Sequence, residues 1–390
     1  MSSEVVGAVQ EWGPSGLIHL SSPGSGLSKG LLEARGGFLW WYLDLVDEAG
    51  NGLVAIWSYG LPFLPGYASA ARRGQAPMAS RRPSLTVSVY RQGELDVYLL
   101  QEYGPDEVVW EATGTGDRWE YGESRLESVV VGGERQVELD LRLEIPGMDE
   151  PLRVVAKSQG PGVYEEGQGH EPAVRAEAPL PDHDWTPILC AAPGRVILEG
   201  PEGQELISGR VYHDRNGGRR PLHDLGIDSW VWGRVALPGE EFIYYVLDGV
   251  DGEQECLFLR IGEDGRREPV EGCVLKRCRT RKNLGGLRWW PTMTVERGGE
   301  EWLRIEHRDV VDSGPFYLRS VLRAWDGRGE YRGIAEVCEP DRVDLAVHRP
   351  LVKMRVHRRR GENSMWLPLF SGPKKGRVSR LLKSVMGGGS

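Results

Sequence analysis

The sequence lacks any long hydrophobic run. No stretch of its 390 residues approaches the roughly eighteen consecutive apolar residues that a membrane-spanning helix needs. Residues 1–13 have neither the basic start nor the apolar run of a secretory leader, so we expect a cytoplasmic protein. Cysteine is also scarce. The five cysteines are odd in number and scattered, which favours reduced thiols over a disulfide framework.

The common enzymatic signatures are absent as well. There is no glycine loop ending in Lys-Ser/Thr, no Gly-x-Ser-x-Gly elbow and no His-Glu-x-x-His motif. Eight histidines lie far apart, without a pair at metal-ligand spacing. If the protein has an active site, we expect that site to need no cofactor and no metal.

Charge is distributed unevenly along the chain. The formal net charge is −9, yet the segment from Arg349 to Lys383 holds eleven Lys/Arg and one acid, Glu362. The rest of the chain is therefore strongly acidic, which argues against nucleic acid as the main partner. Residues 376–386 place apolar side chains at helical spacing among basic ones and predict a short amphipathic helix. Such a helix fits a peripheral membrane contact, or it closes one end of a barrel.

The dominant pattern is the period of two that is typical of β-strands. Glycine- and proline-rich turns separate the alternating segments, and we find no amphipathic helix of three turns between Val9 and Pro340. Many short strands predict an all-β fold of two antiparallel barrels or sandwiches. The clearest predicted strands are 84–90, 94–100, 136–145, 241–247, 256–261 and 301–307.

A segment rich in Gly, Pro and Glu, residues 157–181, divides the chain into two parts of similar size. Because 390 residues exceed one ordinary core, two domains are expected. We predict an N-terminal β domain over 1–178, a C-terminal β domain over 179–375 and the basic helix over 376–386.

Titratable and aromatic residues share strand faces in the second half. In "GRVYHDRNGG" (209–218), alternation places Tyr212 and Asp214 on one face. His183 and Trp185 of "PDHDWTPI" (181–188) likewise share a face. Asp214 could simply cap an Asn-Gly turn, which would lower its pKa, and the other residues could be ordinary core.

Aromatic residues are dense in "GGFLWWYLDLVDEAGNGLVAIWSYGLPFLPGY" (36–67) and in "SWVWGR" (229–234). Such density builds either a packed core or the walls around a long apolar ligand. The candidates for binding such a ligand are Trp40, Trp41, Trp57, Tyr59, Asn216, Trp230, Trp232, Tyr244, Phe316 and Tyr317.

These segments resemble the carotenoid 1,2-hydratases, also called hydroxyneurosporene synthases, of the lipocalin-like hydratase and cyclase superfamily. The likeness covers about Gly36 to Phe370. It rests on the aromatic block 36–67, "HDWTPI", "SGRVYHDRNGG", "WVWGR" (230–234) and "GPFYLRSVL" (314–322), in the family's order. Two departures are Val231, where the family often has a polar residue, and Gly233, where it often has Ser.

The resemblance implies two lipocalin-like domains, a hydrophobic polyene or isoprenoid substrate and a catalytic quartet. The matching positions are His183, Trp185, Tyr212 and Asp214. A buried Asp214 would remain protonated and donate its proton to a terminal double bond. Trp185 and Tyr212 would stabilise the tertiary carbocation, and His183 would orient water or take its proton, with Asn216 bonded to the same water.

Three functions stay open at this point. The first is hydration of an acyclic carotenoid. The second is cyclisation or a pericyclic reaction, which a drier pocket beside Val231 would favour and which gives a product isomeric with the substrate. The third is a carrier that binds a hydrophobic pigment without turnover.

Overall fold

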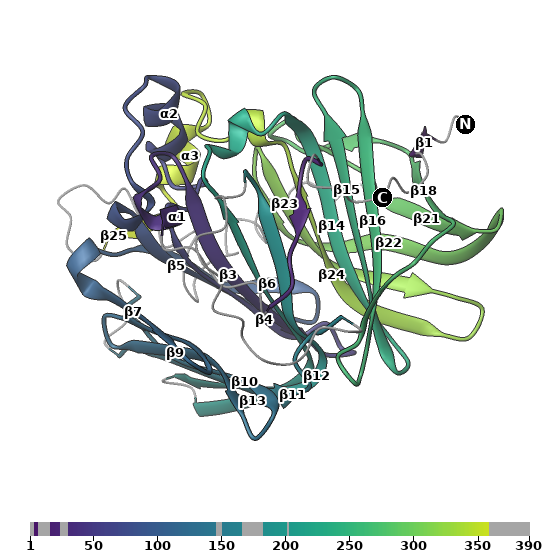
Figure 1. Ribbon diagram of the computed structural model, residues 1–390, viewed down its shortest axis with the longest axis horizontal. Coiled ribbons are helices and arrows are strands. Elements are labelled where there is room, and N and C mark those ends of the chain that lie inside the picture. The colour runs from purple at the N-terminus through teal and green to yellow at the C-terminus, as the bar shows by residue number, and fades with distance from the viewer. Residues whose placement is uncertain are drawn as a thin grey trace, which may run out of the picture.

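The computed structural model describes residues 4–6, 16–23, 30–145, 150–165, 182–200 and 203–358. Within them, alternation and turn punctuation produce two large curled sheets that lie against each other, and a small third one (Figure 1). All six clearly predicted strands are present, as β5, β6, β10, β15, β16 and β22. The prediction of an all-β fold is confirmed.

The first sheet contains thirteen strands among the described residues. In spatial order they are β25 (Val356–Arg358), β6 (Glu94–Glu102), β5 (Pro83–Arg91), β4 (Gly52–Tyr59), β3 (Phe38–Val46), β13 (Gly203–Gly218), β12 (Asp184–Gly200), β11 (Leu152–Gly160), β10 (Glu134–Leu143), β9 (Ser124–Val131), β8 (Gly116–Tyr121) and β7 (Val108–Thr113), with β2 (His19–Leu20) paired to β12. Only the β2–β12 and β25–β6 pairs of this sheet are parallel in the described chain.

The second sheet contains ten strands in the same described ranges, and every pair in it is antiparallel. Their order is β1 (Glu4–Val6), β18 (Cys273–Cys278), β21 (Thr292–Arg297), β22 (Glu300–Ser313), β23 (Tyr317–Trp325), β24 (Glu330–Cys338), β14 (Ile227–Leu237), β15 (Glu240–Gly249), β16 (Gln254–Gly262) and β17 (Arg267–Pro269). A separate ribbon pairs β19 (Arg281–Lys282) with β20 (Arg288–Trp289).

The helices are short. They are α1 (Gly30–Glu33), α2 (Tyr67–Arg72) and α3 (Arg349–Lys353), with 3₁₀ turns η1 (Ala79–Arg81), η2 (Pro105–Glu107), η3 (Leu222–Asp224) and η4 (Pro340–Arg342). None of the helices in the described ranges is long and apolar enough to cross a membrane. The predicted C-terminal helix over 376–386 lies outside the described residues.

Three large apolar clusters and a small fourth one around Phe316 form the core of the described residues. The three large clusters differ in their place. One lies within the curl of the first sheet, one within the curl of the second, and the third lies between the two sheets. All nine residues of β3 are buried because this strand is covered on both faces. A nearly continuous apolar run such as "FLWWYLDLV", interrupted only by Asp44, is typical of such a strand. The cluster between the sheets places aromatic side chains from both halves of the chain in one layer.

The first sheet includes residues from both sides of the predicted linker. Strands β12 and β13 follow residue 181 in the chain, yet β12 pairs with β11 and β13 pairs with β3. Residues 157–160, expected to start the linker, instead complete β11, while 166–181 lie outside the described residues. The domain boundaries stay a prediction.

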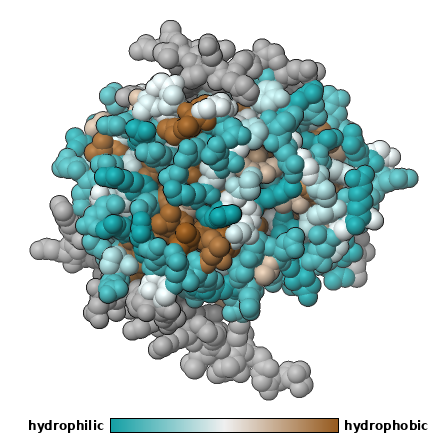
Figure 2. Space-filling view, turned by 90° about the horizontal axis from the view of Figure 1, so that it is seen from below, coloured by the Kyte–Doolittle hydropathy of each residue, from teal (hydrophilic) through white to brown (hydrophobic). Residues whose placement is uncertain are grey.

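Seen from below, hydrophilic residues cover most of the visible face, and a band of apolar side chains crosses it (Figure 2). All five cysteines are free, and four of them are buried.

Candidate active site

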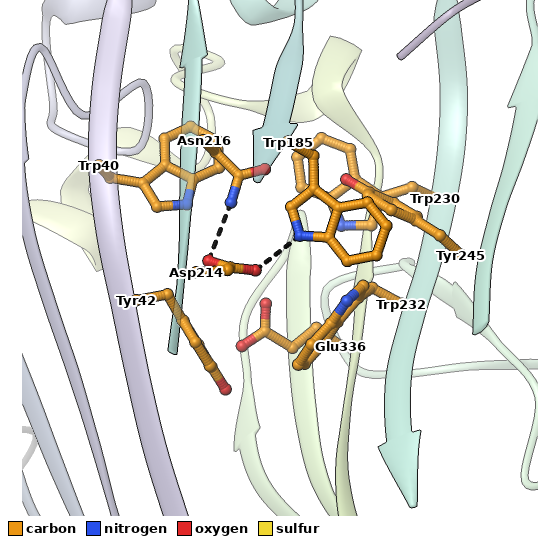
Figure 3. Close-up of a pocket in the computed structure, with 9 residues that line it drawn as sticks. All are labelled: Trp40, Tyr42, Trp185, Asp214, Asn216, Trp230, Trp232, Tyr245 and Glu336. Carbon is orange, nitrogen blue, oxygen red and sulfur yellow. Dashed lines mark hydrogen bonds between the residues drawn. The ribbon is translucent and has the colours of Figure 1, made fainter. Parts of the chain in front are cut away.

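A pocket opens in the aromatic layer between the two sheets (Figure 3). Its cavity volume is about 30 Å³, room for about two water molecules. The lining residues from the first sheet are Trp40, Tyr42, Trp185, Asp214 and Asn216, and those from the second sheet are Trp230, Trp232, Tyr245 and Glu336. Neither sheet forms the pocket alone.

Strand register places Asp214 in the middle of the first sheet. It lies on β13 opposite Tyr42 of β3 on one side and Pro187 of β12 on the other. Tyr212 and Asp214 share a face, as predicted, while Val211 packs into the core on the opposite face. The expected turn at Asn216–Gly217 is wrong, because β13 continues to Gly218.

Three side chains donate hydrogen bonds to the Asp214 carboxyl. The indole Nε1 of Trp185 and the hydroxyl of Tyr212 both donate to Oδ2, each at 2.7 Å. The amide Nδ2 of Asn216 donates to Oδ1 at 3.2 Å. Two donors occupy the acceptor sites of Oδ2, so an acid proton belongs on Oδ1. The alternative in which Asp214 caps a turn is wrong, since these partners are side chains brought together by sheet register.

Burial decides the protonation of Asp214. Its side chain is enclosed, and desolvation raises its pKa to about 7 although Tyr212 and Trp185 favour the charged form. The nearby charges of Glu336 and Asp44 raise the pKa further. A substantial fraction of the Asp214 carboxyl is therefore neutral near pH 7, as an acid catalyst requires.

His183 lies behind the pocket wall rather than in it. Its ring packs against Phe38, Trp40 and Trp230, with ring centroids 5.6, 6.4 and 6.3 Å away. Burial lowers its pKa to about 4, and the nearby Asn216 amide opposes this shift only partly. The Asn216 side chain interacts with the ring, although neither ring nitrogen has a partner at standard hydrogen-bond distance and angle in the described part of the chain. His183 is thus a neutral ring that supports two of the lining tryptophans.

Tyr212 is also one layer back from the cavity. Its ring packs against Trp232 and Tyr42, with centroids 5.1 and 6.1 Å away, and the guanidinium of Arg234 lies 6.0 Å from it. Its hydroxyl reaches Asp214 and also lies 3.2 Å from Trp185 Nε1. Tyr212 therefore orients the acid, whereas the ring of Trp185 itself lines the pocket.

The structure brings together six of the residues expected from the sequence: Trp40, Trp185, Asp214, Asn216, Trp230 and Trp232. Other expected ligand-binding residues lie elsewhere. Trp41, Trp57 and Tyr59 belong to the core of the first sheet, and Tyr244 belongs to the core of the second. Phe316 packs on Phe63, and Tyr317 lies near Arg319, outside the lining. Their roles in binding remain untested.

Three further residues line the pocket that were not among those predicted from the sequence: Tyr42, Tyr245 and Glu336. Tyr42 could have been found because alternation places it on the same face as Trp40. Tyr244 was predicted in place of Tyr245 because β15 is buried on both faces. In such a strand the sequence alone does not say which face meets the ligand. Glu336 carries no signal in its local sequence.

The two departures from the family have structural reasons. Val231 belongs to the core within the second sheet, on the face away from Trp230 and Trp232. Val231 therefore does not line the pocket and does not make it drier, contrary to the expectation from the sequence. Gly233 lies under the ring of Tyr244, and a Cβ there would overlap the Tyr244 hydroxyl.

No group of three or more His, Cys, Asp or Glu side chains is arranged to hold a metal ion within the described ranges.

Residues 173–365 match the family model of the carotenoid hydratase CrtC. The resemblance to the carotenoid hydratase family is confirmed. All four residues of the quartet lie within the matched range.

Individual proteins agree with this relationship. The chain is 25% identical over 357 residues to a hydroxyneurosporene dehydrogenase of Chlorobaculum tepidum, covering 86% of this chain and 91% of that one. It is 28% identical over 324 residues to an acyclic carotenoid 1,2-hydratase of Thiocapsa roseopersicina, covering 77% and 68%. A crystal structure described as AttH from Nitrosomonas europaea has a TM-score of 0.54 at 14% identity, covering 81% and 98%, and it supports the fold.

Proposed function

We propose that the protein is a hydratase that adds water to the terminal double bond of an acyclic carotenoid or a related isoprenoid. The observation that carries this proposal is the Asp214 carboxyl, buried beside an aromatic pocket with its pKa raised to about 7. The match of residues 173–365 to the carotenoid hydratase family, and relatives named acyclic carotenoid 1,2-hydratase, support the substrate class.

The first step is protonation of an isolated alkene. The O–H bond at Asp214 Oδ1 breaks as a C–H bond forms at the less substituted alkene carbon, and a tertiary carbocation results. Trp185 and Tyr212 hold Oδ2, so that Oδ1 keeps the acid proton. Asn216 contacts Oδ1 and orients it. Water then attacks the cation.

The pocket walls suit a cation. Six aromatic rings line the cavity: Trp40, Tyr42, Trp185, Trp230, Trp232 and Tyr245. A cation over such a ring gains about 2 kcal/mol when water is excluded. The cavity of about 30 Å³ holds only water-sized groups as it stands. The end of a polyene would enter when the lining side chains move apart, and the remainder of the substrate would extend through the mouth.

Conversion of a detergent-solubilised acyclic carotenoid by the purified protein tests the proposal. We expect a product heavier by one water, and we expect Asp214→Asn to lower the rate at least about 100-fold because the acid is lost. Asp96→Asn is the matched control, since Asp96 is partly exposed and pairs with Arg91 away from the pocket. An isomeric product would indicate a cyclase, and binding without turnover a carrier. Either would contradict hydration.

A further inference from the structure

The pocket contains a second carboxyl, that of Glu336. It lies on β24 between Trp232 of β14 and Arg319 of β23 in the strand register. Its carboxylate lies below Asp214, between Tyr42 and Trp232 (Figure 3). The charge of Glu336 is one of the causes that raise the pKa of Asp214, so the two groups are electrostatically close.

Arg319 forms an ion pair with Glu336. The guanidinium Nε lies 2.8 Å from Oε1 of Glu336, and both side chains are largely buried. Arg319 also donates to the Tyr90 hydroxyl at 2.9 Å, which fixes its position. The two carboxyls of the pocket therefore have different partners. Asp214 accepts hydrogen bonds from neutral side chains, whereas Glu336 is paired with a guanidinium.

Hydration needs a base as well as an acid. After water bonds to the carbocation, the oxygen must lose a proton, and the base must touch that water. His183 does not line the pocket, whereas Glu336 does. On the assumption that the proposed hydration is correct, we propose that Glu336 is the catalytic base that accepts the proton of the attacking water.

The cycle then balances without any other reactant. Asp214 gives its proton to carbon, the carbon–oxygen bond forms, and a water O–H bond breaks as the proton passes to Glu336. Transfer of that proton from Glu336 to Asp214 through the pocket restores both groups. The net change is the addition of one water to the alkene. Without the base, the cation loses a proton from carbon instead and yields an alkene.

The test uses Glu336→Gln, which keeps the shape and a hydrogen bond to Arg319, and Glu336→Ala, which leaves room for a small carboxylate. We expect the hydration rate of the Gln variant to fall about 10²- to 10⁴-fold, the usual contribution of a general base. We expect formate and acetate to restore part of the Ala variant's rate, with the stronger base restoring more. Glu330→Gln is the control, because Glu330 lies on the same strand and is exposed.

Two results would overturn the inference. One is hydration by Glu336→Gln at the rate of the unmodified protein, and the other is no rescue of Glu336→Ala by either carboxylate. Near-ultraviolet circular dichroism and quenching of tryptophan fluorescence by the carotenoid establish that the variants fold and bind. If the unmodified protein makes no hydrate, the proposed function itself fails. If it does, and only Asp214→Asn is inactive, the role of Glu336 alone is wrong.

Discussion

Among single residues, the decisive quantity is the balance of opposing effects on Asp214. Removal from water raises its pKa, and the hydrogen bonds from Tyr212 and Trp185 lower it, with desolvation prevailing. The result, a pKa of about 7, exceeds that of an ordinary aspartate by about three units, or roughly 4 kcal/mol. Catalysis by the neutral acid is therefore expected to weaken as the pH rises through about 7.

The donors to Asp214 provide a prediction about pH. In Tyr212→Phe, one donor to the charged carboxylate is lost, so the pKa of Asp214 should rise and the alkaline limb of the pH–rate profile should move to higher pH. A hydrogen bond to a charged group contributes about 1.5–3 kcal/mol, which corresponds to a shift of roughly one to two pH units. The measurement is kcat against pH.

A matched control is Tyr245→Phe, because Tyr245 lines the same pocket but donates no hydrogen bond to Asp214 among the described residues. Its pH–rate profile should keep the alkaline limb of the unmodified protein. A limb that stays fixed in Tyr212→Phe, or that moves to lower pH, would show that Asp214 is not the titrating acid.

At the scale of the strands, the alternation of residues correctly predicted which side chains share a strand face. The shared face of Tyr212 and Asp214 and that of Trp230 and Trp232 follow from the period of two and are present in the structure. The period of two tells which residues lie on the same face of a strand, but it does not tell which of the two faces meets the pocket. In β15, which is buried on both sides, it could not tell that Tyr245 rather than Tyr244 meets the pocket.

Glu336 lay beyond sequence reasoning for a different reason. Its position in the pocket depends on β24 lying next to β14, which are separated by nearly a hundred residues in the chain. The order of strands within a sheet is a property of the whole fold, and local pattern does not reveal it. For the same reason, local sequence did not reveal that β12 and β13, which follow residue 181, belong to the first sheet.

For the whole molecule, a buried ion cluster joins the two sheets that enclose the pocket. Arg234 of β14 donates from Nε to Asp44 of β3 at 2.8 Å and from Nη1 to Glu241 of β15 at 2.6 Å. All three side chains are fully buried. Burial raises the pKa of both carboxyls despite the guanidinium between them. Arg234 is the cation that bridges these two carboxyls.

Removing the charge of Arg234 should lower the stability of the folded protein. Arg234→Met leaves two buried carboxyls without their partner, and we expect the free energy of unfolding to fall by about 3–5 kcal/mol in urea titrations. Arg153→Met is the control, since Arg153 also bridges two carboxylates, Asp140 and Glu199, but at the surface, and it should change little. Equal effects of the two substitutions would contradict a structural role for the buried cluster.

The central claim is that Asp214 is a neutral acid in the folded protein until the pH approaches 7. An NMR titration of the aspartate carboxyl carbons, with Asp214→Asn used to assign the signal, measures this most directly. We expect the resonance missing from the variant to titrate near pH 7. A carboxyl already ionised at about pH 5, like an ordinary aspartate with a pKa near 3.9, would contradict the account.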